Sequence, residues 1–317
     1  MAEKQLLSEI LGIKYPIIMA PMFLVSNAKM LIAAGNNGIT GAVPALNYRT
    51  DVAFRAAIAE IRSNTEGPIG VNLIVNKSNP KMPEQLKTCV DLKVDYIITS
   101  LGSPKAVIAK CKPAGIKVFC DVVDLKYALK VEALGADGII AVNKEAGGHA
   151  GPTSREELIP LLAKNCKIPI ISAGGVGNYK ELQHVISLGA CGASVGSIFI
   201  ASEESDVSDE YKQACVNYGA KDIVLSTKVS GSPCTVINTP YVQKIGTKQN
   251  WLERVLSKNK RLKKWMKMLT FVKGMKSLEK SAFSATYKTV WCAGPTIEHV
   301  KSIRPIKEII ADLTKSE

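Results

Sequence analysis

The sequence lacks long apolar runs and lacks a leader-like start. No stretch approaches the roughly 20 apolar residues that span a bilayer. Residues 1–5 form neither the basic region nor the apolar region of a secretion signal. The chain has 317 residues, 46% of them hydrophobic, which is enough to bury one large core. These features predict a globular cytoplasmic protein without a membrane partner.

Histidine and closely spaced cysteines are also scarce. The three histidines, His149, His184 and His299, are far apart in the sequence, and no two cysteines stand at C-x-x-C spacing. A structural zinc site therefore has little support. We expect free thiols rather than disulfides at the eight cysteines, which are Cys89, Cys111, Cys120, Cys166, Cys191, Cys215, Cys234 and Cys292.

Acidic residues are too few to balance the charge, which is +13 at neutral pH. Residues 244–280 hold twelve Lys/Arg and only Glu253 and Glu279, so most of the excess lies in one segment. Apolar residues such as Leu262, Trp265 and Leu269 recur there near helical spacing. We expect a basic helical lid or flank packed on the core. Binding to nucleic acid or to an anionic membrane is the alternative.

Short β-branched runs alternate with amphipathic helical stretches from residue 15 to about residue 220. This rhythm is typical of parallel strands joined by helical crossovers. Eight such units predict a (β/α)8 TIM barrel. The expected strands are 16–20, 38–42, 69–73, 96–100, 117–122, 138–142, 168–172 and 193–196.

The rhythm also suggests how the chain is divided. We assign residues 1–230 to the barrel core and residues 231–317 to the basic C-terminal segment. A doubly wound open sheet is the alternative architecture, but no G-x-G-x-x-G motif follows the first strand.

Two glycine-bearing turns follow the last two expected strands. Ala173, Gly174 and Gly175 come after the seventh, and Gly196 and Ser197 come after the eighth. These are the places where TIM barrels commonly hold a phosphate on backbone N–H groups. Simple tight turns are the alternative, but the pair of turns at the two expected places favours a phosphate.

The ends of the first and third strands offer a surface for a flat ring. Ala20, Pro21 and Met22 give a rigid backbone that a ring can approach closely, and Asn72 offers both a donor and an acceptor to a heterocycle. Neither feature is specific by itself, because an Asn at a strand end is often a turn residue.

His149 lies between glycines in the loop that follows the sixth strand. Such a loop contributes no core, so we expect the imidazole to project into the cleft at the strand ends. Imidazole titrates near neutral pH and serves as a base or as a hydrogen-bond donor. We therefore predict a catalytic role for His149 and structural roles for His184 and His299.

Five motifs in order resemble the nitronate monooxygenases, formerly called 2-nitropropane dioxygenases. They are PIIMAPM, GVNL, EAGGHAG, PIISAGGVGN and GASVGSIFIASEES, and the resemblance runs over nearly the whole chain. The EAGGHAG motif and the paired glycine loops are shared with the related flavin-dependent enoyl-acyl-carrier-protein reductases.

The resemblance implies noncovalent FMN. Its phosphate would lie on Gly174, Gly175, Gly196 and Ser197, and its ring near Ala20, Pro21, Met22 and Asn72. His149 falls on the family's catalytic histidine, which would hold a nitronate or deprotonate a nitroalkane, with O2 as co-substrate and a carbonyl compound and nitrite as products.

Two residues depart from the family pattern. Asp121 ends the fifth strand where some members carry a basic residue near the flavin, which we expect to change the electrostatics of the cofactor site. Pro295 replaces the glutamine of a W-x-A-G-Q stretch.

Three other functions compete with nitronate oxidation. An NAD(P)H-dependent enoyl-thioester reductase shares the motifs. Asp121, Glu145 and His149 could together bind a divalent metal, although the glycine loops would then have no role. A flavin-binding module without activity is the third. The sequence leaves a homodimer open.

Overall fold

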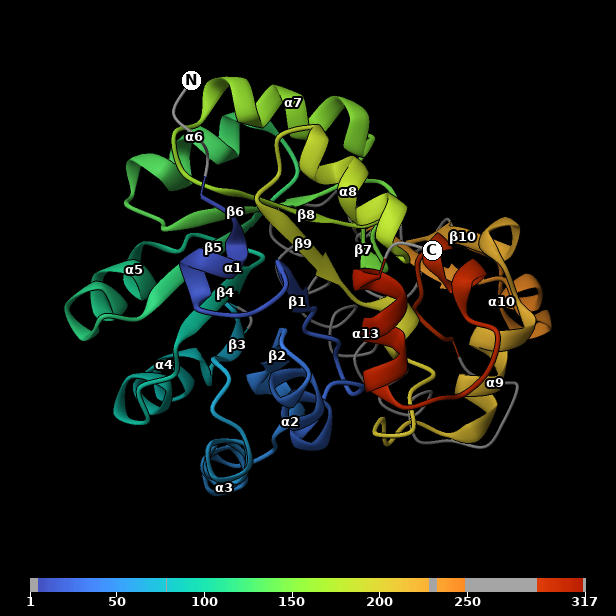
Figure 1. Ribbon diagram of the computed structural model, residues 1–317, viewed down its shortest axis with the longest axis horizontal. Helices are drawn as coiled ribbons and strands as arrows, with labels where there is room; N and C mark the ends of the chain where they lie inside the picture. The colour runs from blue at the N-terminus through green and yellow to red at the C-terminus, as the bar shows by residue number, and fades with distance from the viewer. Residues whose placement is uncertain (1–4, 78, 228–232, 249–289, 316–317) are drawn as a thin grey trace, which may run out of the picture.

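The computed structural model describes residues 5–77, 79–227, 233–248 and 290–315. Eight parallel strands close into a barrel in the order β1-β2-β3-β4-β5-β6-β8-β9, with β9 paired to β1. Figure 1 shows the helices arranged around this ring of strands. The barrel strands are β1 (Ile17–Met19), β2 (Thr40–Pro44), β3 (Ile69–Ile74), β4 (Tyr96–Ser100), β5 (Lys117–Val122), β6 (Gly138–Val142), β8 (Ile170–Ala173) and β9 (Gly192–Val195).

The predicted TIM barrel is therefore confirmed, and each predicted strand lies within two residues of an observed one. The strands form because β-branched runs are apolar on both faces, as a wall between two packed layers requires. The helices between them begin at polar caps such as Asn27, Thr50 and Asp124, whose side chains accept backbone N–H groups. The helices are α1 (Leu7–Leu11), α2 (Ala28–Asn36), α3 (Asp51–Asn64), α4 (Met82–Asp91), α5 (Lys105–Cys111), α6 (Leu125–Ala133), α7 (Arg155–Asn165), α8 (Tyr179–Ser187), α9 (Asp209–Asn217), α10 (Pro240–Ile245) and α13 (Ile306–Thr314).

The interior of the barrel is filled at the amino ends of its strands. Leu7, on α1, is fully buried there, and its N–H donates to Cys191 O at 2.8 Å. Tyr96, the first residue of β4, is also fully buried there, with its hydroxyl 3.0 Å from Gly41 O and 3.1 Å from Thr40 Oγ1. Because this end is packed, only the carboxyl ends of the strands remain for a binding site.

A second, smaller sheet lies beside the barrel. It has the order β10-β11-β7, in which β10 (Ile223–Ser226) and β11 (Cys234–Ile237) are antiparallel, and β7 (Gly148–His149) is a short strand after β6. The sequence did not predict this sheet. Its strands are four residues or shorter, so they carry too little periodicity to be recognised.

The C-terminal helix α13 packs against α2 and α8 and completes the ring of helices (Figure 1). The predicted basic helices fall mostly outside the described residues, which include only 244–248 of that segment. The division at residue 230 therefore remains a proposal. Among the described residues, no helix combines the length and the apolar character needed to cross a membrane.

Candidate functional site

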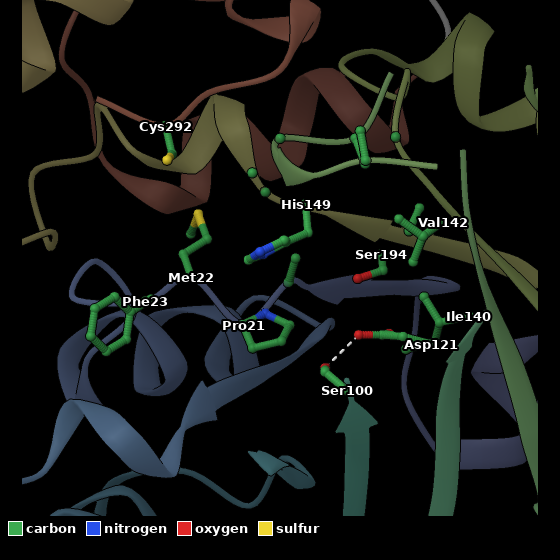
Figure 2. Close-up of a pocket in the computed structure, with 18 of the residues that line it drawn as sticks. Pro21, Met22, Phe23, Ser100, Asp121, Ile140, Val142, His149, Ser194 and Cys292 are labelled. Atoms are coloured by element: carbon green, nitrogen blue, oxygen red, sulfur yellow. Dashed lines mark hydrogen bonds between the residues drawn. The ribbon is translucent and has the colours of Figure 1, made fainter. Parts of the chain in front are cut away.

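A cavity of about 550 Å³ opens at the carboxyl ends of the barrel strands. Its wall contains every residue that the sequence predicted for the site, although these residues come from six strand ends and the loops that follow them. They are Ala20, Pro21, Met22, Asn72, Asp121, His149, Ala173, Gly174, Gly175, Gly196 and Ser197. Figure 2 shows part of this wall.

The two glycine turns form a cradle with unused hydrogen-bond donors. Gly174 and Gly175 have φ values of +109° and +77°, a conformation that side chains rarely adopt. Among the described residues, the N–H groups of Gly175, Val176, Gly196 and Ser197 donate no hydrogen bond. Converging free N–H groups fit a phosphate, because they supply donors and positive partial charge without a competing side chain.

Neither the backbone conformation nor the packing of the protein requires a glycine at position 196. An added Cβ would lie 3.5 Å from Ala20 Cβ and 3.6 Å from Met22 Sδ, which is ordinary contact. The Gly196 backbone is also outside the left-handed region. The space above Gly196, next to two residues predicted to face a ring, is therefore available for a ligand.

A partly buried ion pair lies next to the glycine turn of β8. The Arg155 guanidinium donates to Gly175 O and lies with its Nε 3.5 Å from Glu145 Oε2. Asn143, fully buried, joins the two loops, since it accepts from Glu145 N at 2.8 Å and donates to Gly174 O at 3.0 Å. Arg155 thus places a cation behind the expected phosphate position without lining the cavity.

His149 is held by a short strand of the small sheet, whereas the sequence predicted a loop. Gly148 and His149 form β7, which pairs with Thr235 and Cys234 of β11. The buried Thr235 hydroxyl also donates to Ala146 O at 2.7 Å. Figure 2 shows the imidazole pointing into the cavity on the side of Met22. Part of the side chain is exposed, but the surrounding cavity wall desolvates the ring and so lowers the pKa of His149. His149 is therefore neutral at physiological pH.

A chain of hydrogen bonds ends at Asp121. Asn72 donates to Ile98 O at 3.1 Å and to Ser100 Oγ at 2.7 Å, and Ser100 donates to Asp121 Oδ2 at 2.5 Å (Figure 2). Both donors of the Asn72 amide are thus used within the protein, and only its carbonyl is available to a ligand. Burial raises the pKa of Asp121 to about 6, against the opposing effect of the Ser100 hydrogen bond.

The charge of the cavity wall is unusual for an anion site. Among its described residues there is no lysine or arginine, whereas Asp121 and Glu145 both line it. The hydrogen-bond donors that this wall offers to an anion are therefore mainly backbone N–H groups of the two glycine turns.

The other predicted roles depend on residues outside this wall. His184 and His299 pair with Glu156 and Glu181, at 3.5 and 3.3 Å, so both have structural partners. In the described part of the chain, no three His, Cys, Asp or Glu residues gather as metal ligands. Pro295 begins the 3₁₀ helix η5 (Pro295–His299), and its neighbours Cys292 and Thr296 line the cavity.

Sequence reasoning missed Ser100, Arg155 and Thr235. Ser100 is the last residue of β4, so its position at a strand end was a usable signal. Arg155 and Thr235 act through contacts across 20 and 89 residues, and no local pattern reveals such contacts.

Comparisons with known proteins agree with this geometry. The nitronate monooxygenase family model matches residues 4–316. A Rhodococcus jostii protein named (3aS,4S,5R,7aS)-5-hydroxy-7a-methyl-1-oxo-octahydro-1H-indene-4-carboxyl-CoA dehydrogenase is 30% identical over 75% of this chain and 67% of its own length. The nitronate monooxygenase of Paraburkholderia phytofirmans is 29% identical over 72% of this chain and 75% of its own.

Solved structures are similar over nearly the whole length. FabK from Thermotoga maritima has a TM-score of 0.84 and 27% identity, with 98% of this chain and 95% of that chain covered. The nitroalkane oxidase from Streptomyces ansochromogenes has a TM-score of 0.79 at 20% identity, over 97% and 96% of the two chains. At that identity the similarity concerns the fold.

Proposed function

The chain belongs to the nitronate monooxygenase family and is a flavin-dependent oxidoreductase. We propose that it oxidises alkyl nitronates, and nitroalkanes, with FMN and O2. The products would be a carbonyl compound and nitrite. The main support for this proposal is that His149 and the two glycine turns line the same cavity.

FMN fits the residues of this cavity. The free N–H groups of the Gly174–Gly175 and Gly196–Ser197 turns suit one phosphate, and Ala20, Pro21 and Met22 provide a flat apolar surface. Asn72 would accept a hydrogen bond from the ring through its carbonyl. When bound, FMN supplies the electron transfer between the substrate and O2.

His149 would act as the base. A neutral imidazole accepts a proton, and the low pKa of His149 keeps it neutral over the physiological range. For a nitroalkane the ring would remove the proton on the carbon that bears the nitro group. For a preformed nitronate it would only orient the nitro oxygens. The pairing of β7 with β11 holds the ring in place for both tasks.

The test is a comparison of substrates with purified protein. We expect released FMN, identified by mass spectrometry, together with O2 consumption and nitrite formation on a nitronate. Recovery of FAD or of no flavin from folded protein would contradict the cofactor assignment. FMN without nitrite formation would contradict the substrate assignment only.

Reduction of an enoyl thioester with NAD(P)H is the second candidate. A relative at 30% identity is named as a dehydrogenase of a carboxyl-CoA compound, and FabK is similar over nearly the whole chain. The described part of the wall has no lysine or arginine, which suits a neutral acyl chain better than an anion. Rapid anaerobic bleaching of the flavin by NADPH, followed by reoxidation with an enoyl thioester, would favour this candidate.

Two further assignments remain proposals. We expect a small-molecule substrate and O2 as partners, without nucleic acid or a membrane, and a homodimer remains open. Size-exclusion chromatography with light scattering would measure the assembly.

A further inference from the structure

Two cysteines that are far apart in the sequence meet at the cavity. Cys234 begins β11, and Cys292 precedes η5, so 58 residues separate them. Their Sγ atoms lie 3.5 Å apart. Both sulfurs are thiols in the structure. A disulfide bond is about 2.05 Å long, so the sulfurs need to approach by about 1.5 Å to bond.

The pair is reachable from the cavity. Both residues line the cavity, Cys234 being 2% exposed and Cys292 half-buried. Figure 2 shows the Cys292 sulfur at the wall on the side of Met22. Cys89 and Cys111, by contrast, are fully buried in the outer core and do not line the cavity. A small oxidant that enters the cavity therefore reaches Cys292 first.

Each cysteine belongs to a different part of the wall. Cys234 is the direct strand partner of His149. Cys292 is held by Tyr211, whose hydroxyl donates to Cys292 O at 2.5 Å, and two residues later Gly294 N donates to Ser197 Oγ at 2.8 Å. A bond between the sulfurs would therefore join the strand that holds the histidine to the segment that contacts the predicted phosphate turn.

We propose that Cys234 and Cys292 form a redox-active dithiol that closes to a disulfide in the wall of the cavity when a peroxide enters it. The Cys292 sulfur attacks the O–O bond of hydrogen peroxide, which gives a sulfenic acid and one water. The Cys234 thiol then attacks the Cys292 sulfur, forms the S–S bond and releases a second water. The two thiols lose two electrons and two protons, and the peroxide takes them up.

The neighbouring thiol decides which product the oxidation gives. The hydrogen bond with Cys234, together with burial, raises the pKa of Cys292, so its reactive thiolate is rare at neutral pH. An isolated thiol of this kind would react slowly and stop at the sulfenic acid or be oxidised further. A second thiol at 3.5 Å captures the sulfenic acid before further oxidation, and the product is reversible by reduction.

The experiment treats the folded, flavin-loaded protein with hydrogen peroxide, blocks the remaining thiols and maps the peptides without reduction. We expect a peptide pair joined through Cys234 and Cys292, two hydrogens lighter than the reduced pair and separated by dithiothreitol. Cys234→Ser and Cys292→Ser are matched controls that keep size and polarity. Cys234→Ser should leave Cys292 as sulfenic or sulfinic acid.

A second measurement is the rate at which the protein releases its flavin. The oxidised protein should release its flavin several-fold more slowly than the reduced protein, and the Cys234→Ser protein should show no such change. Independent modification of both cysteines without a cross-link in the wild type would overturn the proposal. A cross-link that appears only after denaturation would also overturn it. Both readouts are independent of the substrate that the enzyme oxidises.

Discussion

Ser100 donates its hydroxyl hydrogen to Asp121 Oδ2 at 2.5 Å, and the orientation of this bond is fixed by Asn72. The Asn72 amide nitrogen faces Ile98 O, so its second hydrogen must point to Ser100 Oγ. Ser100 is left with one hydrogen, which goes to Asp121. A proton taken up by Asp121 is therefore carried on Oδ1, so the protonated acid donates through the oxygen that Ser100 leaves free.

Asp121→Asn should stabilise the protein at alkaline pH. The native pKa of about 6 lies above the ordinary 3.8, so the folded protein binds this proton more tightly than the unfolded chain. The ionised carboxyl consequently weakens the fold as pH rises from about 4 to about 6. We expect a gain of ~1–2 kcal/mol at pH 8, less than the full shift implies because water enters the cavity. The gain should vanish at pH 4.

Denaturant unfolding at pH 4 and pH 8 measures this difference. Ser100→Ala is the control, because it removes the hydrogen bond to Asp121 and keeps the carboxyl. That variant should be less stable at pH 8 than the wild type. An Asp121→Asn variant with equal or lower stability at pH 8 would show that the carboxyl is well solvated.

Gly196→Ala should weaken FMN binding without unfolding the barrel. The added methyl fits beside Ala20 and Met22 in the protein itself and takes only the space assigned to the ligand. We expect the FMN dissociation constant to rise at least about tenfold, or about 1.4 kcal/mol, with unchanged circular dichroism. Equilibrium titration of the apoprotein with FMN measures this effect.

Gly175 is a poor position for the same experiment. A Cβ there would collide with Glu145 and Arg155, and its φ of +77° disfavours any side chain. Gly175→Ala should therefore lose stability as well as flavin. If Gly196→Ala binds FMN with unchanged affinity, the phosphate or the ring lies elsewhere in the cavity.

The barrel and most of its site could be predicted because they depend on local patterns. A short local sequence marks the end of each strand. Once the strands close into a barrel, the fold itself places these ends next to one another. Ala20, Asn72, His149, Gly174 and Gly196 were found in this way, since all five stand at strand ends or in the loops that follow.

The contacts that hold these residues could not be predicted. Thr235 reaches Ala146 across 89 residues, and Cys234 reaches Cys292 across 58. Such pairs depend on how the long segment between the two residues folds back onto the barrel. The hydrophobic periodicity of the sequence does not specify this path. The sequence therefore placed His149 at the strand ends, where the structure has it, but did not predict the short strand that holds it.

Thr235→Val should reduce turnover by loosening the strand that carries His149. The change keeps the shape but leaves Ala146 O without its hydrogen bond at 2.7 Å and Gly148 O without its weaker one at 3.3 Å. We expect a loss of about 1–3 kcal/mol of stability and a lower kcat with little change in KM. Thr235→Ser restores the hydroxyl and should recover kcat. Equal losses in both variants would indicate that packing, and not the hydrogen bond, positions the histidine.

His149→Asn separates proton abstraction from binding. A positioned base typically contributes about 10²–10⁴-fold, so activity on a neutral nitroalkane should fall by that factor. The nitronate has already lost its proton and should lose one hydrogen bond, on the order of 1.5–3 kcal/mol at most.

Because burial lowers the pKa of His149, the wild type should keep its nitroalkane activity until pH falls below 6.5. This acid limb should persist in Asp121→Asn and disappear in His149→Asn. Equal losses on both substrates would make His149 an orienting residue, and no loss on either would remove it from catalysis.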